Sequence, residues 1–291
     1  WSSTQSGSGY HDFEHVYEAV EQAALFLHTL GEARLVMESL SEGVQRYAAF
    51  WYQIDQLYRK FIYHARKSGQ ASLMDCLLEQ IENLYSNAFL LKLGDRFQEL
   101  VTAAPMWEAA PVLRQDVFYG HWVQPFVTKE NKVCVIISDA MRYEVGAELA
   151  ALLAEDPKST VQLTPRLGVL PSCTRLGMAA LLPHKTLEIT GDFKVLADGL
   201  PCEDLKQREA ILQSYVPNSR CVQFDEIKMM KRADLRQLVT GMEVVYVYHN
   251  QIDARGDKPN TEHEVFTACA EAVEEIYDLI KRLSVSEIGR A

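Results

Sequence analysis

In the first third of the chain, apolar residues recur every three or four positions, the spacing of one face of an α-helix. The pattern predicts a helix from His11 to Leu30 that ends at Gly31, and a second helix from about Ala33 to Lys67. A third helix is expected from Ser72 to Leu93, where Gly94 ends it. We therefore predict an all-helical region over residues 1–102.

Prolines and tryptophans then interrupt the helical pattern. The interrupting residues are Pro105, Trp107, Pro111, Trp122 and Pro125. Because proline disrupts a helix interior, residues 103–128 are interpreted as a linker between two domains. Large aromatic side chains bury much apolar area, so both indoles are expected to lie mainly buried at the junction.

Residues 129–291 alternate apolar runs with amphipathic segments, the pattern of a parallel sheet covered by helices. The unbroken run from Val133 to Ile137 predicts a central strand that is buried on both faces. Further strands are expected at Val161–Thr164 and Val244–Tyr248, and helices at 141–154, 174–182 and 261–283. Thr261 and Glu264 have the spacing of a capping box at the start of the last helix.

Charge and cysteine content limit the classes of function. A net charge of −11 argues against a broad nucleic-acid-coating surface, because phosphate contacts need clustered lysine and arginine. Scattered cysteines without a C-x-x-C pair predict reduced, mostly buried thiols and a cytoplasmic location. No apolar run approaches the roughly 20 residues that span a bilayer. Without an initiator methionine, Trp1 is expected to begin a fragment.

A basic stretch and a histidine pair are minor candidate binding groups. The basic residues, on neighbouring turns of a predicted helix, are Lys228, Lys231, Arg232 and Arg236. We expect a solvated face there, with contact to a phosphate-bearing partner as the alternative. His11 and His15 lie one helical turn apart, but no third ligand is spaced with them, which favours surface histidines over a metal site.

The stronger candidates for chemistry follow the predicted strands. Asp139 comes directly after the apolar run at Val133–Ile137, and Ser172 and Thr174 come just before the helix at 174–182. A hydroxyl at a helix start lies beside free N–H groups that hold phosphate. The alternative is structural, because aspartate, serine and threonine are also preferred helix caps.

A carboxylate pair follows the strand Val244–Tyr248. Asp253 and Asp257 are four residues apart, so both carboxylates point the same way on a helical turn. A turn rich in Asn, Asp and Gly is the structural alternative. Taken with Asp139 and Thr174, this pair supplies the parts of a metal-assisted phosphoryl-transfer site, at the sheet edge where α/β proteins bind ligands.

Three segments, SDAMRYE, LPSCTRLGMAALLPH and YHNQIDARGDK, stand in this order along the chain. In sequence and spacing they resemble the PglZ family of bacterial phage-defence (BREX) proteins, which belongs to the alkaline phosphatase superfamily. The resemblance covers about Phe118 to Leu283. It implies an α/β fold with a mostly parallel sheet flanked by helices and preceded by the helical region. It also implies two metal ions, commonly zinc, and a nucleophile at a helix start.

The resemblance assigns roles to individual residues. Thr174 matches the nucleophile, Asp139 the first metal-ligand aspartate, and Asp253 the first residue of an Asp-x-x-x-His ligand pair. Asp257 stands where that histidine would be, and a carboxylate suits Mn²⁺ or Mg²⁺ better than imidazole does. His249 is expected to substitute as a ligand or to orient Asp253.

Arg142 and Ser172 are the expected substrate contacts. The remaining metal ligands of the superfamily would follow Ala291, so the C-terminal part of the α/β domain is expected to be missing here. Residues 1–291 alone are therefore expected to show no ordered two-metal centre and little phosphodiesterase activity.

The resemblance thus predicts a metal-dependent phosphodiesterase or nuclease of a phage-exclusion system, acting on nucleic acid or a nucleotide. The alternative is a non-catalytic scaffold or regulatory subunit of a phage-defence complex. In either case the expected partners are other defence subunits, such as a DNA methyltransferase.

Overall fold

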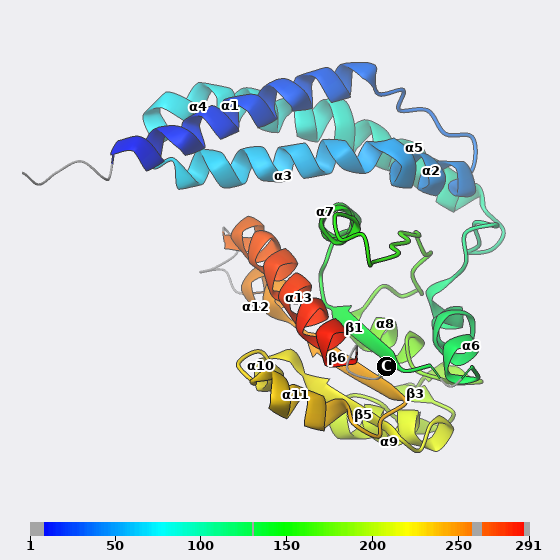
Figure 1. The fold of residues 1–291 in the computed structure, drawn as a ribbon. Helices are drawn as coiled ribbons and strands as arrows, with labels where there is room; N and C mark the ends of the chain where they lie inside the picture. Colours follow the sequence, from blue (N-terminus) through cyan, green and yellow to red (C-terminus); the bar gives the residue numbers. More distant parts are fainter. Residues whose placement is uncertain (1–8, 130, 258–263, 288–291) are drawn as a thin grey trace, which may run out of the picture. The chain divides into compact units, whose positions relative to one another are not determined.

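The computed structural model of the chain describes residues 9–129, 131–257 and 264–287 (Figure 1). The chain divides into two compact units. The helical unit consists of Trp1–Val112, Arg142–Glu148 and Leu163–Pro165; the α/β unit consists of Leu113–Met141, Leu149–Gln162 and Arg166–Ala291. Two short segments that come after Met141 in the chain thus belong to the helical unit. The predicted limits of the two domains and the linker stay a prediction.

The helical unit is built from long helical stretches. Its elements are α1 (Gly9–Glu32), α2 (Leu40–Arg46), the π-helix η1 (Tyr47–Trp51), α3 (Tyr52–Lys67), α4 (Ala71–Asn83), the π-helix η2 (Leu84–Leu90) and α5 (Leu91–Ala103). The second expected helix was placed to start too early: Ser39 caps α2 by accepting a hydrogen bond from the Glu42 N–H. The expected end at Gly94 is also wrong, because the helix continues to Ala103.

Packing of apolar faces explains why these helices persist where local signals would end them. Phe26, Ile54, Phe61 and Phe89 are completely shielded from solvent, and α1 and α3 run alongside each other (Figure 1). Tertiary burial of an amphipathic face contributes more to helix stability than the cost of one glycine.

The main sheet of the α/β unit has three parallel strands in the order β1 (Val133–Ser138), β6 (Val244–His249), β5 (Ser219–Gln223). The strand predicted from the run at 133–137 is present. Its predicted place is wrong, because in the described sheet β6 is central and buried along its whole length, whereas β1 lies at the edge with Cys134 exposed. The expectation that most thiols are buried is also wrong, because Cys76 and Cys173 are exposed as well as Cys134, and only Cys202, Cys221 and Cys269 of the six cysteines are buried.

The expected strand at Val161–Thr164 does not form, and these residues have no regular secondary structure. Leu163–Pro165 instead belongs to the helical unit. Proline has no N–H to donate to a strand ladder, so the sequence already contained a signal against a central strand at this point.

Helices and a small second sheet complete the α/β unit, to which only the second part of α7 belongs. The connecting elements are η3 (Gln115–Val117), η4 (Tyr119–Val123), α6 (Gln124–Val127), α7 (Tyr143–Ala154), α8 (Thr174–Ala180), α9 (Leu205–Tyr215), α10 (Phe224–Ile227), α11 (Arg232–Val239), α12 (Gln251–Gly256) and α13 (Val265–Glu287). The antiparallel sheet consists of β2 (Leu187–Ile189), β3 (Val195–Ala197) and β4 (Leu200–Pro201). The capping box expected at Thr261 lies outside the described residues.

The two faces of β6 belong to two hydrophobic clusters. Tyr246 and Tyr248 pack in the cluster formed with α8 and α9, and Val245 and Val247 pack in the cluster formed with α11 and α13. This alternation follows from the two-residue period of a strand. The sheet is therefore covered on both faces, as the sequence predicted.

Three other expectations concern exposed or aromatic side chains. Trp107 and Trp122 are half-buried, and the Arg166 guanidinium lies 5.2 Å from the Trp122 ring. Their place at a domain junction stays a prediction. The basic residues of the α11 region are exposed. No helix in the described ranges is both long and apolar enough to cross a membrane.

Helix α9 begins with a capping box that can be tested directly. The Asp204 carboxylate accepts a hydrogen bond from the Gln207 N–H at 2.8 Å, and the Gln207 side chain accepts one from the Asp204 N–H. Asp204→Ala is expected to lower the free energy of unfolding by about 1 kcal/mol. Asp204→Asn keeps an acceptor and should cost clearly less. Urea unfolding of both variants measures the difference, and equal losses would contradict the cap.

Candidate functional site

Asp139 lies where two parallel strands end together. Ser138 pairs with His249 in the sheet register, and the Asp139 N–H donates to the His249 carbonyl at 2.9 Å. The Asp139 carboxylate accepts from the Ala140 N–H at 3.0 Å, and Ala140 has a positive φ of 58°, which is uncommon for alanine. Asp139 therefore closes a tight turn and does not cap α7, which begins only at Tyr143.

Asp253 and Asp257 follow the neighbouring strand. Asp253 lies in α12, and the Asp257 N–H donates to the Asp253 carbonyl at 3.0 Å. Burial raises the pKa of Asp139, and the Asp257 carboxylate raises it further. Burial also raises the pKa of Asp253, with added effects from Asp139 and Asp257. The structure thus brings the three carboxylates into electrostatic range, and we call them the carboxylate cluster.

His249 is held by protein groups on both ring nitrogens. Nδ1 lies 2.8 Å from Ser138 Oγ, and Nε2 lies 3.1 Å from the Glu275 carboxylate. The side chain is buried, with its ring against Phe224. A histidine engaged in this way fixes the end of β6 and has no ring nitrogen left for a metal ion. His249 contacts Ser138 and Glu275, whereas the sequence suggested a contact with Asp253. Glu275 lies in α13, and no motif in the sequence indicated its role.

Ser172 and Thr174 lie at the start of α8. Both residues are exposed, and no side-chain hydrogen bond caps this helix. Among the residues that the structure describes, neither hydroxyl makes a hydrogen bond to the carboxylate cluster. The capping alternative is therefore not observed, and the Thr174 hydroxyl is accessible.

Arg208 of α9 is a further charged residue of this part of the α/β unit. Its Nε donates to the Cys202 carbonyl and its Nη2 to the Glu203 carbonyl, both at 3.0 Å. Its guanidinium lies 5.0 Å from the Tyr248 ring. The Glu203 carboxylate lies 3.5 Å from Arg175, the residue after Thr174. Sequence reasoning missed Arg208, because it falls in a segment without a motif and is positioned only by the fold.

The carboxylate cluster does not by itself form a metal-binding set. Within the described ranges, no three His, Cys, Asp or Glu side chains lie close enough together to hold a metal ion. Carboxylate oxygens are the donors that Mg²⁺ and Mn²⁺ prefer, so the donor type fits a hard divalent ion while the arrangement does not complete its shell.

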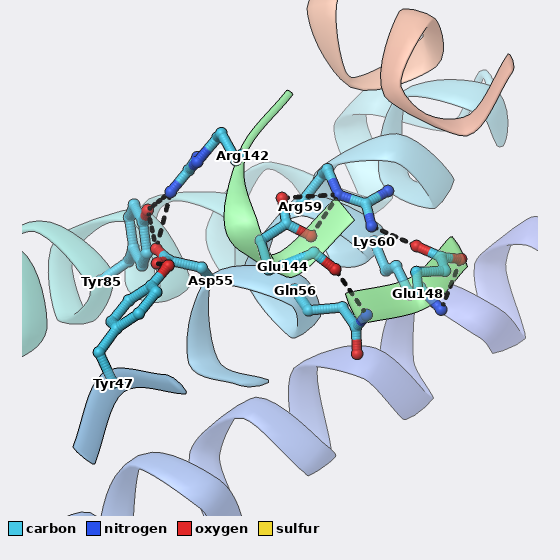
Figure 2. Close-up of polar contacts among 9 residues, drawn as sticks. All are labelled: Tyr47, Asp55, Gln56, Arg59, Lys60, Tyr85, Arg142, Glu144 and Glu148. Carbon is cyan, nitrogen blue, oxygen red and sulfur yellow. Dashed lines mark hydrogen bonds and ion pairs between the residues drawn. The ribbon is translucent and has the colours of Figure 1, made fainter. Parts of the chain in front are cut away.

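Arg142 is engaged within the helical unit. Its Nη2 lies 2.9 Å from Asp55 Oδ1 and 3.3 Å from the Tyr85 hydroxyl. Asp55 also accepts hydrogen bonds from Tyr47 and Tyr85, at 2.5 and 2.6 Å (Figure 2). Asp55 therefore balances the positive charge of Arg142. The sequence had suggested Arg142 as a substrate contact.

A second ionic cluster fixes the first turns of α7 to α3 within the same unit. Arg59 Nε lies 3.0 Å from both Glu144 carboxylate oxygens, and Arg59 Nη2 bonds to Glu148 (Figure 2). Lys60 pairs with Glu148 at 3.0 Å, and the Gln56 amide donates to the Glu144 carbonyl. The segment that directly follows the Asp139 turn is thus anchored at several points.

Comparison with known proteins gives a consistent result. Residues 118–289 match the family model described as the BREX system PglZ alkaline phosphatase-like domain. The alkaline phosphatase-like protein PglZ of Bacillus cereus (strain H3081.97) is 34% identical over 275 residues, which cover 93% of this chain and 32% of that protein.

A second relative extends the similarity over the same span. The alkaline phosphatase-like protein BrxZ of Escherichia coli O9:H4 (strain HS) is 36% identical over 302 residues, covering 97% of this chain and 33% of that protein. The chain thus spans about a third of the length of either relative.

Proposed function

This chain belongs to the PglZ family of alkaline phosphatase-like domains of the BREX system, and on that premise we propose that it contributes to a phosphohydrolase site that serves phage exclusion. The observation that carries the proposal is the carboxylate cluster. Asp139 and the pair Asp253 and Asp257 follow two neighbouring parallel strands. Besides burial, the Asp257 carboxylate raises the pKa of Asp139, and the Asp139 and Asp257 carboxylates raise the pKa of Asp253. Open α/β sheets bind ligands at this carboxyl edge.

Thr174 is the proposed nucleophile. Its hydroxyl is exposed at the start of α8, so it can approach a phosphorus atom without breaking a bond within the described structure. The hydroxyl has to lose its proton during attack. We propose that the site formed with the carboxylate cluster favours this loss. Ser172, two residues earlier and also exposed, is proposed to contact the substrate.

The carboxylate cluster is proposed to supply part of the ligand shell of a divalent ion, zinc by the family resemblance or Mn²⁺ or Mg²⁺ by the donor type. Such an ion lowers the pKa of a bound hydroxyl and neutralises charge on a phosphoryl group. The protein's own contribution is to hold the three carboxylates at one edge, through the Asp139 turn and the His249–Glu275 contact.

The proposed substrate class is a phosphodiester of a nucleotide or nucleic acid. The family model names the BREX system, so we also propose that the protein acts with other defence subunits, a DNA methyltransferase among them. A scaffold role is the second candidate, and the observation that favours it is the incomplete ligand set among the described residues.

Manganese binding by this chain tests the proposal. Electron paramagnetic resonance of free Mn²⁺ should show weak binding, and Asp139→Asn and Asp253→Asn should each weaken it by about tenfold or more, since each removes a charged ligand. Asp192→Asn, which neutralises an exposed carboxylate between β2 and β3, should bind as the unsubstituted chain does. If the unsubstituted chain binds no Mn²⁺, or if all three variants bind equally, the cluster is not a metal site and the scaffold role is favoured.

A further inference from the structure

Arg208 differs from two other arginines of the α/β unit in having no carboxylate partner. Arg175 pairs with Glu203 and Arg255 with Glu271, but Arg208 forms no ion pair with any residue that the structure describes. Its hydrogen bonds go to two backbone carbonyls, those of Cys202 and Glu203. Carbonyl oxygens orient a guanidinium and leave its positive charge uncompensated.

The fold holds this charge at the carboxyl edge of the sheet. The guanidinium lies over the ring of Tyr248, and Tyr248 pairs in register with Ile137, two residues before Asp139. Arg208 therefore lies near the strand ends that the carboxylate cluster follows, and it forms no ion pair with a described residue of that cluster.

The support under Arg208 is rigid. Helix α9, which carries it, begins at the Asp204 capping box, and Tyr248 is buried in the central strand. The Tyr248 hydroxyl is buried and has no hydrogen-bond partner of good geometry within the described residues. Burial raises the pKa of this hydroxyl, and the nearby Arg208 guanidinium partly opposes that rise. An arginine held in this way loses little conformational freedom when it binds an anion.

We propose that Arg208 is the anion-binding residue of this site and that it takes a phosphoryl oxygen of a phosphate-bearing substrate. The planar guanidinium matches the geometry of phosphate oxygens and forms charge-assisted hydrogen bonds to them. This inference rests on the proposed function. The charge of Arg208 also removes a physical difficulty of that function. Three carboxylates repel a phosphate, and a fixed positive charge beside them lowers that repulsion.

Binding of inorganic phosphate, measured by titration calorimetry with and without Mn²⁺, tests the proposal. Arg208→Met is expected to weaken phosphate binding by about tenfold to a hundredfold, the effect of losing a charge-assisted hydrogen bond. Arg208→Lys keeps the positive charge but not the planar, forked guanidinium. Its phosphate affinity should lie between those of the unsubstituted chain and Arg208→Met. Lys206→Met is the matched control: Lys206 is exposed on the same helix, two residues away and so on another face, and its removal should change nothing.

A spectroscopic signature separates binding from a purely structural role. In the unsubstituted chain, phosphate should shift one arginine Nε–H signal in a nitrogen-proton spectrum, and that signal should be missing in Arg208→Lys. Circular dichroism confirms that each variant is folded; if Arg208→Met does not fold, Arg208→Lys and the Nε–H shift decide.

The outcomes for Arg208 and for the carboxylate cluster are distinguishable. Phosphate affinity that is equal in the unsubstituted chain, Arg208→Met and Arg208→Lys, or undetectable in all of them, overturns the role of Arg208 whatever the Mn²⁺ result. Conversely, Arg208-dependent phosphate binding in a chain that binds no Mn²⁺ supports the anion site and counts against the proposed metal-dependent function alone.

Discussion

Replacing Thr174 with alanine is expected, on the proposed function, to lower phosphodiester hydrolysis by about a thousandfold or more in a full-length family member that carries this sequence. The reason is that a nucleophile has no substitute within its site, so its removal costs most of the catalysed rate. Because the Thr174 side chain is exposed and makes no hydrogen bond to the described residues, the thermal unfolding temperature should not change. Turnover of a chromogenic phosphodiester with Mn²⁺ or Zn²⁺ measures the loss.

Two neighbouring substitutions make this prediction specific. Thr174→Ser keeps a hydroxyl on the same carbon atom and should keep a substantial part of the rate. Cys173→Ala removes an exposed thiol one residue earlier and should hydrolyse the substrate at the unsubstituted rate. Hydrolysis that is unchanged in Thr174→Ala, or that persists after a chelator has removed divalent ions, would show that the proposed chemistry is wrong.

The sequence predicted those features that depend on neighbouring residues. The apolar runs at 133–137 and 244–248 do form parallel strands, and β1 and β6 end together as expected. Because these strands end at one edge, the carboxylates that follow them meet there, which strand-end reasoning anticipates without knowledge of the rest of the fold. The roles of Thr174 and the carboxylate cluster stay predictions.

Features that depend on distant residues were not predictable in this way. The order of strands makes β6 central and β1 an edge strand, although both have the same apolar character. Arg208 reaches the site because α9 packs against β5, the neighbour of β6, and this brings its guanidinium over the ring of Tyr248. Likewise Arg59 and Glu144 are 85 residues apart, and nothing in the spacing of either helix indicates that they pair. Periodicity identifies a buried face but not what it packs against.

The Arg59–Glu144 pair is expected to be the most sensitive point of the helical unit. Their side chains are only 2% and 0% exposed, so removing one leaves the other charged and buried. Arg59→Met is expected to lower the free energy of unfolding by about 3–5 kcal/mol, as for other buried ion pairs that lose one partner. Urea unfolding followed by circular dichroism measures the change. Lys60→Met is the matched control: Lys60 also pairs with Glu148 but is 33% exposed, so its loss should cost less than about 1 kcal/mol.

The double variant Arg59→Met/Glu144→Leu distinguishes desolvation from simple loss of packing. It removes both charges, so no carboxylate is left unpaired beneath α3, and it should be clearly more stable than Arg59→Met alone. If Arg59→Met costs no more than Lys60→Met, or if the double variant is the least stable of the three, the pair does not anchor α7 through its buried charges.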